Sequence, residues 1–188
     1  ASYFYSLVAL SAVGTQVTLS SYKKNSLQGD SVLAEIYKHF GVKTTFQGNK
    51  IVISKTEISS QESLNFNHQS SPDIAQTVAV TCFGLGIGCH LTGLHTLKIK
   101  ETDRLEALKT ELSKLGANIS VTNDSLTLEG LSAINSNIAI STYNDHRMAM
   151  AFAPLALRVP IVIEKAEVVS KSFPTFWEDL KQIGFQIS

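Results

Sequence analysis

The chain has 188 residues, of which 44% are hydrophobic and 17% charged, and its formal net charge at pH 7 is zero. This length and apolar content suffice for one domain with a substantial core. The balanced charge argues against general binding to nucleic acid or to a membrane surface, because both need a strong positive field. Cys82 and Cys89 lack the spacing of a disulfide framework or a zinc site, which indicates buried thiols.

The first stretch, residues 1–13, is apolar like the hydrophobic part of a signal peptide. No basic segment precedes it, and the same pattern recurs later in the chain. We therefore expect an internal helix in a chain cut from a longer protein. No apolar run approaches the roughly 20 residues that span a bilayer.

One order of elements recurs along the chain. Each repeat has an apolar helical stretch, then a short strand, then an amphipathic helix. The last two apolar stretches begin about 72 residues apart, which indicates a structural repeat. The apolar stretches are 1–13, 73–85 and 145–157, the strands 16–20, 89–93 and 160–164, and the amphipathic helices 31–40, 103–115 and 174–183.

Glycines and turn residues complete the units. Each amphipathic helix ends at a glycine, where positive φ is expected: Gly41, Gly116 and Gly184. Gly48-Asn49 and Asn123-Asp124 predict β-hairpins. The third unit ends at 185–188, in a strand-like segment that leaves it one strand short. Residues 55–70, rich in Ser, Gln and Asn, are expected to include a surface loop.

The repeat predicts an α/β (α+β) fold in which residues 1–188 form one domain of βαβαββ units, at about 1–54, 71–130 and 142–188. The first helix of each unit is apolar nearly all round, so it should be buried on every side. The second carries a polar face, which we assign in the middle unit to Glu106, Lys109, Glu111 and Lys114. We expect an inside-out α/β barrel, with helices inside and sheets outside. The alternative, a doubly wound sheet, would make the strands the most apolar elements.

Basic residues occur near helix starts, where the helix dipole disfavours cations. Four residues share this placement: Lys100, Arg104, Arg147 and Lys171. Bound anions explain it, because free N–H groups and guanidinium groups favour phosphate and carboxylate. Equivalent helix starts of repeated units lie at one end of a domain, so we expect one anion site. The alternative is scattered surface charge, with Glu101 and Arg104 as a helix-stabilising pair.

Two further candidates have ordinary explanations from sequence alone. Asp73 follows Ser-Pro at the start of an apolar stretch, a common signal for a helix start. His146 could equally be a packed or capping histidine.

At these residues the sequence resembles the EPSP synthase family, the 3-phosphoshikimate 1-carboxyvinyltransferases. The segments Lys100-Glu101-Thr102-Asp103-Arg104 and Asn144-Asp145-His146-Arg147-Met148-Ala149-Met150 are highly specific, whereas Gln28-Gly29-Asp30 alone is weak. Further matches at Ala1-Ser2-Tyr3-Phe4, Pro72-Asp73 and Lys171-Ser172-Phe173-Pro174 follow the family order and span essentially the whole chain.

The resemblance implies a two-domain enzyme that transfers the enolpyruvyl group of phosphoenolpyruvate to the 5-hydroxyl of shikimate 3-phosphate, releasing phosphate through a tetrahedral intermediate. It implies no cofactor and no metal. This chain resembles the domain that contains the C-terminus, without the short N-terminal segment that completes it. We expect a cytoplasmic enzyme of aromatic amino-acid biosynthesis whose partners are both substrates and the missing N-terminal domain, with no nucleic acid or membrane partner.

The resemblance also implies roles for individual residues. Asp73 corresponds to the base that takes the 5-hydroxyl proton, and Glu101 to the carboxyl that exchanges protons with the methylene carbon. Lys100 corresponds to a catalytic residue beside both substrates that assists proton transfer or neutralises developing charge. Asp145 and His146 support this group, and Thr96 is a possible contact of the shikimate phosphate, where some relatives carry Asn.

The phosphoenolpyruvate anion is held, by the same resemblance, by Arg104, Arg147 and Lys171. Guanidinium groups suit this task because they bind multiply charged anions with two parallel hydrogen bonds.

Two other functions stay open. A UDP-N-acetylglucosamine enolpyruvyl transferase would share the fold and the donor, although the two specific segments favour the shikimate enzyme. A non-catalytic anion-binding domain of the same fold would not require Asp73 and Glu101, and their presence argues against it.

Overall fold

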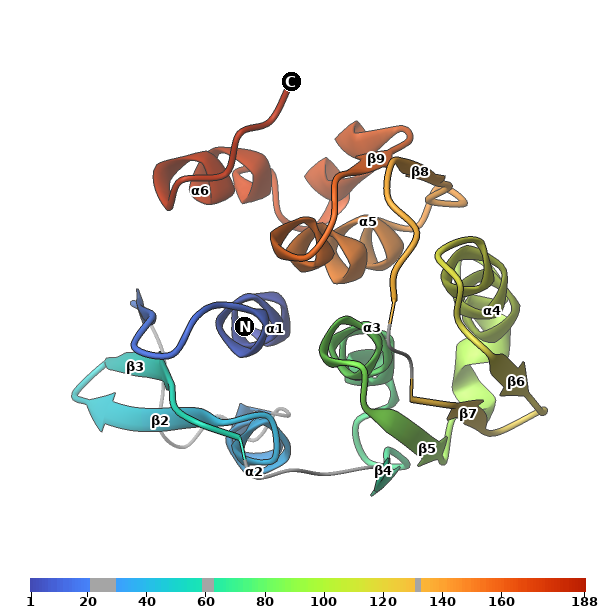
Figure 1. Ribbon diagram of the computed structural model, residues 1–188, viewed down its shortest axis with the longest axis horizontal. Helices are drawn as coiled ribbons and strands as arrows, with labels where there is room; N and C mark the ends of the chain where they lie inside the picture. Colours follow the sequence, from blue (N-terminus) through green and yellow to red (C-terminus); the bar gives the residue numbers. More distant parts are fainter. Residues whose placement is uncertain (21–29, 59–62, 131–132) are drawn as a thin grey trace.

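The structure is a computed structural model that describes residues 1–20, 30–58, 63–130 and 133–188. Three helices, α1 (Ser2–Leu10), α3 (Ala75–Leu85) and α5 (His146–Phe152), pack against one another in the middle of the molecule, and the strands lie around them (Figure 1). The motif 28–30, at Gln28-Gly29-Asp30, falls largely outside the described residues.

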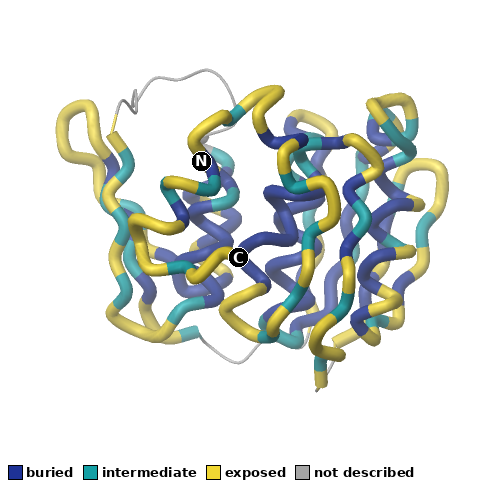
Figure 2. Tube along the Cα trace, turned by 90° about the horizontal axis from the view of Figure 1, so that it is seen from above, coloured by how far each residue is buried: buried dark blue, intermediate teal, exposed yellow. Residues whose placement is uncertain are grey.

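The three central helices are buried because nearly every position in them is apolar or small. In α3, every residue from Ala75 to Gly84 is buried, and in α5 every residue from Met148 to Phe152 is. Figure 2 shows the buried segments gathered in the interior and the exposed ones around them. The α/β class and the burial of these helices are confirmed. Among the described residues the strands form three separate sheets and no closed barrel.

The first two sheets contain the predicted hairpins. In the first, β1 (Gln16–Leu19), β3 (Lys50–Lys55) and β2 (Val42–Gln47) pair antiparallel, and Gln47 faces Lys50 across the Gly48-Asn49 turn. The second has the order β4 (Ser63–Asn67), β5 (Gly88–Thr92), β7 (Leu126–Leu128) and β6 (Ile119–Val121). The third consists of β8 (Ile138–Ile140) and β9 (Ile161–Ile163), which pair parallel.

Three predictions about local structure need correction. The segment 55–70, expected to include a surface loop, also contains the unpredicted strand β4, because Leu64 is buried beside β5 in a parallel pairing that composition could not indicate. Residues 185–188 are not a strand, since no strand in the described part of the chain pairs with them. The stretch 145–157 divides into α5 and a 3-10 helix, Ala153–Leu157, because Pro154 cannot donate the hydrogen bond that would continue the α-helix.

The outer helices are α2 (Asp30–Lys38), α4 (Arg104–Lys114) and α6 (Phe176–Gln182). The glycines that follow them have φ of +70°, +103° and +104°: Gly41, Gly116 and Gly184. This confirms the predicted helix ends, because a Cβ is disfavoured at such φ values.

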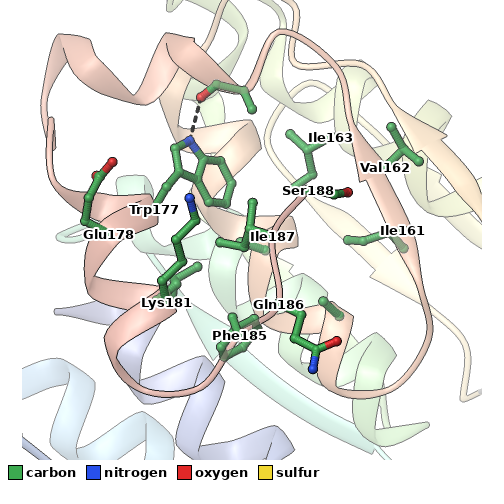
Figure 3. Close-up of a pocket in the computed structure, with 14 residues that line it drawn as sticks. Ile161, Val162, Ile163, Trp177, Glu178, Lys181, Phe185, Gln186, Ile187 and Ser188 are labelled. Carbon is green, nitrogen blue, oxygen red and sulfur yellow. Dashed lines mark hydrogen bonds between the residues drawn. The ribbon is translucent and has the colours of Figure 1, made fainter.

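A hollow of about 450 Å³ lies between α6, β9 and the C-terminal residues (Figure 3). Its lining is mainly apolar and includes Ile161, Ile163, Trp177 and Ile187. The Trp177 indole Nε1 donates to the Ala166 carbonyl at 2.9 Å, which fixes the ring at the wall of the hollow.

Among the described residues, no helix is long and apolar enough to cross a membrane.

Cations also lie at the C-terminal ends of the central helices α1 and α3, and one of them reaches the end of α2 as well. The Lys55 Nζ donates to the carbonyls of Ala9 at 2.6 Å and Phe40 at 2.7 Å, and the Arg158 Nε donates to that of Gly84 at 2.9 Å. Carbonyls without helical partners and the negative end of the dipole account for both charges. At this end of the molecule, helix structure alone explains the basic residues.

Burial, and to a lesser extent Arg158, lowers the pKa of Lys55 from 10.5 to about 8. Between pH 8 and 10.5 the unfolded chain binds more protons at Lys55 than the folded chain does, so stability rises with pH in this range. The contribution of Lys55 to stability is therefore fully present above pH 10.5 and is lost as the pH falls through 8. We expect the unfolding free energy of the wild type to rise, relative to that of Lys55→Met, as the pH rises from about 7 to 10. Urea denaturation across this range measures it, and a constant difference would contradict the assignment.

Candidate active site

The helix starts converge at one end of the molecule. A cavity of about 700 Å³ is lined by residues at the starts of all three central helices, including Tyr3, Pro72, Asp73, His146 and Arg147. The opposite ends of α1 and α3 lie together near Lys55 and Arg158. The central helices therefore point the same way, as expected for repeated units, and their N-terminal ends share one region.

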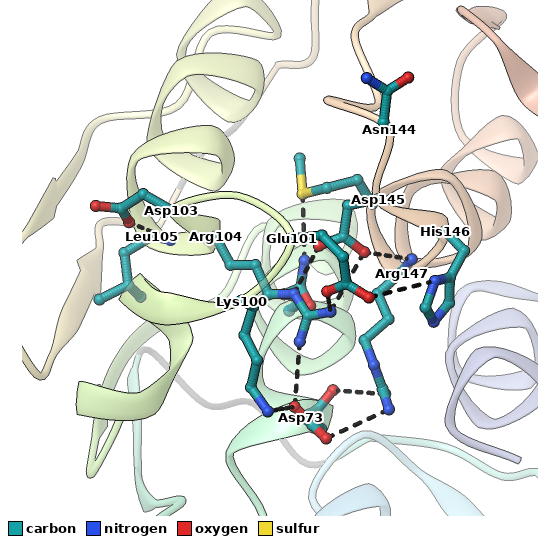
Figure 4. Close-up of polar contacts among 12 residues, drawn as sticks. Asp73, Lys100, Glu101, Asp103, Arg104, Leu105, Asn144, Asp145, His146 and Arg147 are labelled. Carbon is teal, nitrogen blue, oxygen red and sulfur yellow. Dashed lines mark hydrogen bonds and ion pairs between the residues drawn. The ribbon is translucent and has the colours of Figure 1, made fainter. Parts of the chain in front are cut away.

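Arg104 is the centre of the charged cluster in this region (Figure 4). Its side chain is only 2% exposed and contacts three carboxylates. The Nε donates to Asp145 at 2.6 Å, one terminal nitrogen to Asp73 at 3.1 Å, and the other to Glu101 at 2.7 Å. Each of its three nitrogens donates to a carboxylate. Carboxylates of the protein therefore balance the charge of Arg104 without a bound anion.

The aspartates at the starts of two helices explain how the cluster forms locally. Asp103 caps α4 by accepting from the backbone N–H groups of Leu105 and Glu106, both at 3.1 Å. Asp145 caps α5 by accepting from the Arg147 backbone N–H at 2.8 Å, while its carboxylate, fully buried, also holds Arg104. These caps begin the helices at the residues that carry the charges.

Asp73 lies in the 3-10 helix Pro72–Ile74 before α3, where three cations meet. Its carboxylate is 3.5 Å from the Lys100 Nζ, 3.1 Å from Arg104 and 3.3 Å from Arg147. The carboxylate is 39% exposed, so a reactant in the cavity can reach it. The structure therefore brings together the predicted base and three of the four predicted cations.

Glu101 and His146 lie beside this group. The Glu101 contact with Arg104 is the helix pair considered from sequence, and its other oxygen is 3.9 Å from the His146 Nδ1. Burial lowers the pKa of His146, although Asp145 and Glu101 oppose the shift. The His146 ring is thus a largely enclosed neighbour of the Glu101 carboxyl.

Two predicted residues are less closely joined to the cluster. The Lys171 Nζ donates to the Asn144 carbonyl at 2.7 Å, next to the start of α5. Thr96 lies in the 3-10 helix His95–Ile99, which packs against the 3-10 helix that carries Asp73. Its hydroxyl is buried without a hydrogen-bond partner, so it has an unused donor.

Sequence reasoning missed two residues. Tyr3 lines the cavity, and burial raises its pKa, against the opposing effect of Arg147. Glu111 was assigned to a polar face but has no exposed surface. Its distance of seven residues from Arg104 and three from Leu108 placed it on the buried face of α4, a signal that its charge concealed. Among the described residues, no group of three or more His, Cys, Asp or Glu side chains is arranged to hold a metal ion.

Comparison with known proteins identifies the family. The profile of EPSP synthase (3-phosphoshikimate 1-carboxyvinyltransferase) matches residues 1–180. The chain belongs to the EPSP synthase family. The 3-phosphoshikimate 1-carboxyvinyltransferase of Bacteroides fragilis is 43% identical over the whole chain, which covers 46% of that protein. That of Clostridioides difficile is 38% identical over 94% of the chain, covering 40% of that protein.

Solved structures agree in fold. An EPSP synthase from Acinetobacter baumannii superposes on the whole chain with a TM-score of 0.82 and 24% identity, and 45% of that protein is covered. The enolpyruvyl transferase NikO from Streptomyces tendae gives a TM-score of 0.70 at 13% identity, with 43% covered. The chain spans about half the length of the family members that it matches.

The buried contact between Arg104 and Asp145 gives a test of the cluster. Asp145→Asn keeps a helix cap but removes the charge that compensates Arg104, so we expect the free energy of unfolding to fall by about 3 kcal/mol, as for a broken buried ion pair. Urea denaturation measures the loss. The control is Glu35→Gln, which breaks an exposed pair with Lys38 and should cost less than about 1 kcal/mol. Equal losses in the two variants would contradict the central role of the pair.

Proposed function

We propose that this chain supplies the acid–base groups and part of the anion site of an enzyme that transfers enolpyruvyl from phosphoenolpyruvate to the 5-hydroxyl of shikimate 3-phosphate. The observation that carries the proposal is the convergence of Asp73 and Glu101 with three cations at the starts of the central helices, in a member of the EPSP synthase family. Because the relatives are about twice as long, the complete enzyme includes residues beyond this chain.

In this proposal Lys100 and Arg147 hold phosphoenolpyruvate. Both are about one-third exposed beside the cavity, and their positive charges suit the phosphate and carboxylate of that substrate. Lys171 joins them in this proposal from its position beside the Asn144 carbonyl, just before α5. Arg104 contributes less directly, because its side chain is only 2% exposed and each of its nitrogens already donates to a carboxylate.

The proposed chemistry moves protons at an oxygen and at a carbon. The 5-hydroxyl oxygen attacks C2 of phosphoenolpyruvate while Asp73 accepts its proton and Glu101 donates a proton to C3, giving a tetrahedral intermediate. The bond from C2 to the phosphate oxygen then breaks, phosphate leaves with the proton that Asp73 had accepted, and Glu101 takes a proton back from C3. Asp73 lines the cavity, and the Glu101 side chain, 41% exposed, lies beside it through their shared contact with Arg104.

His146 and Thr96 have supporting roles in the proposal. The His146 Nδ1 lies 3.9 Å from the Glu101 carboxylate without a hydrogen-bond partner, so it can donate to that carboxylate if the two approach during the reaction. The Thr96 hydroxyl, which has an unused donor, is offered to the phosphate of shikimate 3-phosphate once the local packing opens.

The proposal extends to the whole domain and its partner. Residues 1–188 form one domain of three units, at about 1–54, 71–130 and 142–188, closing as an inside-out barrel. The other domain of the same enzyme covers the cavity and supplies the rest of the shikimate 3-phosphate site. A UDP-N-acetylglucosamine enolpyruvyl transferase is the alternative, since the fold is shared with the enolpyruvyl transferase NikO. Assaying the parent protein with each acceptor distinguishes the two, and activity with neither would favour a non-catalytic domain.

Substitution of the acid–base groups in the parent protein tests the assignment. Asp73→Ala and Glu101→Gln should each reduce turnover by about a hundredfold or more, the effect of losing general acid–base catalysis. Arg147→Ala should instead raise KM for phosphoenolpyruvate more than KM for shikimate 3-phosphate. The control is Lys109→Ala, an exposed residue of α4 that pairs with Glu106. Steady-state kinetics measure all four, and near-normal constants in folded Asp73 and Glu101 variants would refute the roles.

The 188-residue chain alone should release no detectable phosphate from the two substrates. Its cavity is open to water, which weakens charge interactions, and it lacks the groups that orient both reactants. Phosphate release is the measurement, with the parent protein as the positive control. Turnover by the chain alone would mean that the active site is divided differently.

A further inference from the structure

A buried carboxylate on α4 lies outside the cluster already described. Glu111 has no exposed surface. It follows Arg104 by seven residues, about two helical turns, so both side chains leave α4 on the same face. A carboxylate removed from water needs hydrogen-bond donors, and the identity of those donors indicates what it does.

Two of the three donors to Glu111 come from the segment just before α5. The Ser141 backbone N–H donates at 3.1 Å and the Tyr143 hydroxyl at 2.7 Å, while Lys114 of the same helix donates at 2.7 and 2.9 Å. Burial raises the pKa of Tyr143 to about 12, and the bond to Glu111 adds to the shift, so the hydroxyl remains a donor. Glu111 thus ties α4 to residues 141–143.

The segment that Glu111 holds has an uncommon backbone. Tyr143 and Asn144 have φ of +55° and +56°, in the left-handed region that residues other than glycine seldom adopt. Such a conformation persists only where surrounding contacts maintain it. The Asn144 carbonyl accepts from Lys171, and the next residue, Asp145, caps α5. The conformation of this turn therefore helps to place the Lys171 ammonium group and the first turn of α5.

We propose that Glu111 is a positioning residue that holds the turn 141–144 so that Lys171 and Arg147 face the anion site. It touches no reacting group and acts through Ser141 and Tyr143. The effect on catalysis rests on the proposed function, whereas the holding of the turn does not.

Kinetics of the full-length parent protein test the catalytic part. Glu111→Gln puts an amide group where donors converge, and we expect KM for phosphoenolpyruvate to rise about tenfold, with a smaller rise for shikimate 3-phosphate. Tyr143→Phe removes one hydrogen bond from a partly exposed ring without endangering the fold, and should give the same selective rise at about threefold. The double variant should be little worse than Glu111→Gln alone, because both act through one contact.

The matched control is Glu106→Gln, on the same helix, where an exposed glutamate contacts Lys109 at 3.7 Å. It should leave both KM values within about twofold of the wild type. A general loss of packing would raise both KM values equally in Glu111→Gln and Tyr143→Phe, and that result would overturn the positioning role.

Amide hydrogen exchange of the parent protein tests the turn independently of activity. Exchange in residues 141–147 should accelerate in Glu111→Gln and Tyr143→Phe but not in Glu106→Gln, with α3 unchanged in all three. Unchanged exchange at 141–147 would overturn the proposal. Absence of turnover in the wild-type parent would instead overturn the proposed function, and the exchange result would still decide whether Glu111 holds the turn.

Discussion

The charged end of this molecule depends on the buried contact between Arg104 and Asp145. A guanidinium group enclosed by protein is tolerated only when opposite charges surround it, and Asp145 is its most buried partner. Because Asp145 also caps α5, the contact sets where that helix begins and therefore where Arg147 lies. The same guanidinium reaches Asp73 and Glu101, so one group aligns segments from three parts of the chain.

Positive side chains lie at both ends of the central helices, but for different physical reasons. At the C-terminal ends, Lys55 and Arg158 donate to carbonyls that lack helical partners, and the helix dipole favours positive charge there. At the N-terminal ends, Lys100 and Arg147 lie where the dipole disfavours cations, and both contact the carboxylate of Asp73, which is 39% exposed. This contrast separates cations that serve the fold from cations that serve the proposed anion site.

Sequence reasoning succeeded where one segment carried the whole signal. The all-round apolar character of 77–83 required burial wherever the helix lay, and Gly48-Asn49 defined a hairpin locally. It failed where the partner was distant. Leu64 became part of a strand only because β5 lay beside it, and residues 185–188 found no strand to pair with.

The sequence by itself determined the burial of the apolar helices, the family and the charged residues that meet at the helix starts, because apolar patterns and motifs can be recognised within one segment of the chain. Only the tertiary structure decided which of those charged residues contact one another and which are buried. Arg104 is paired with three carboxylates, and Glu111 is buried rather than solvated. Side-chain partners depend on which residues distant in sequence meet in space. The sequence alone therefore does not distinguish a charged residue that water solvates from one in a buried ion pair.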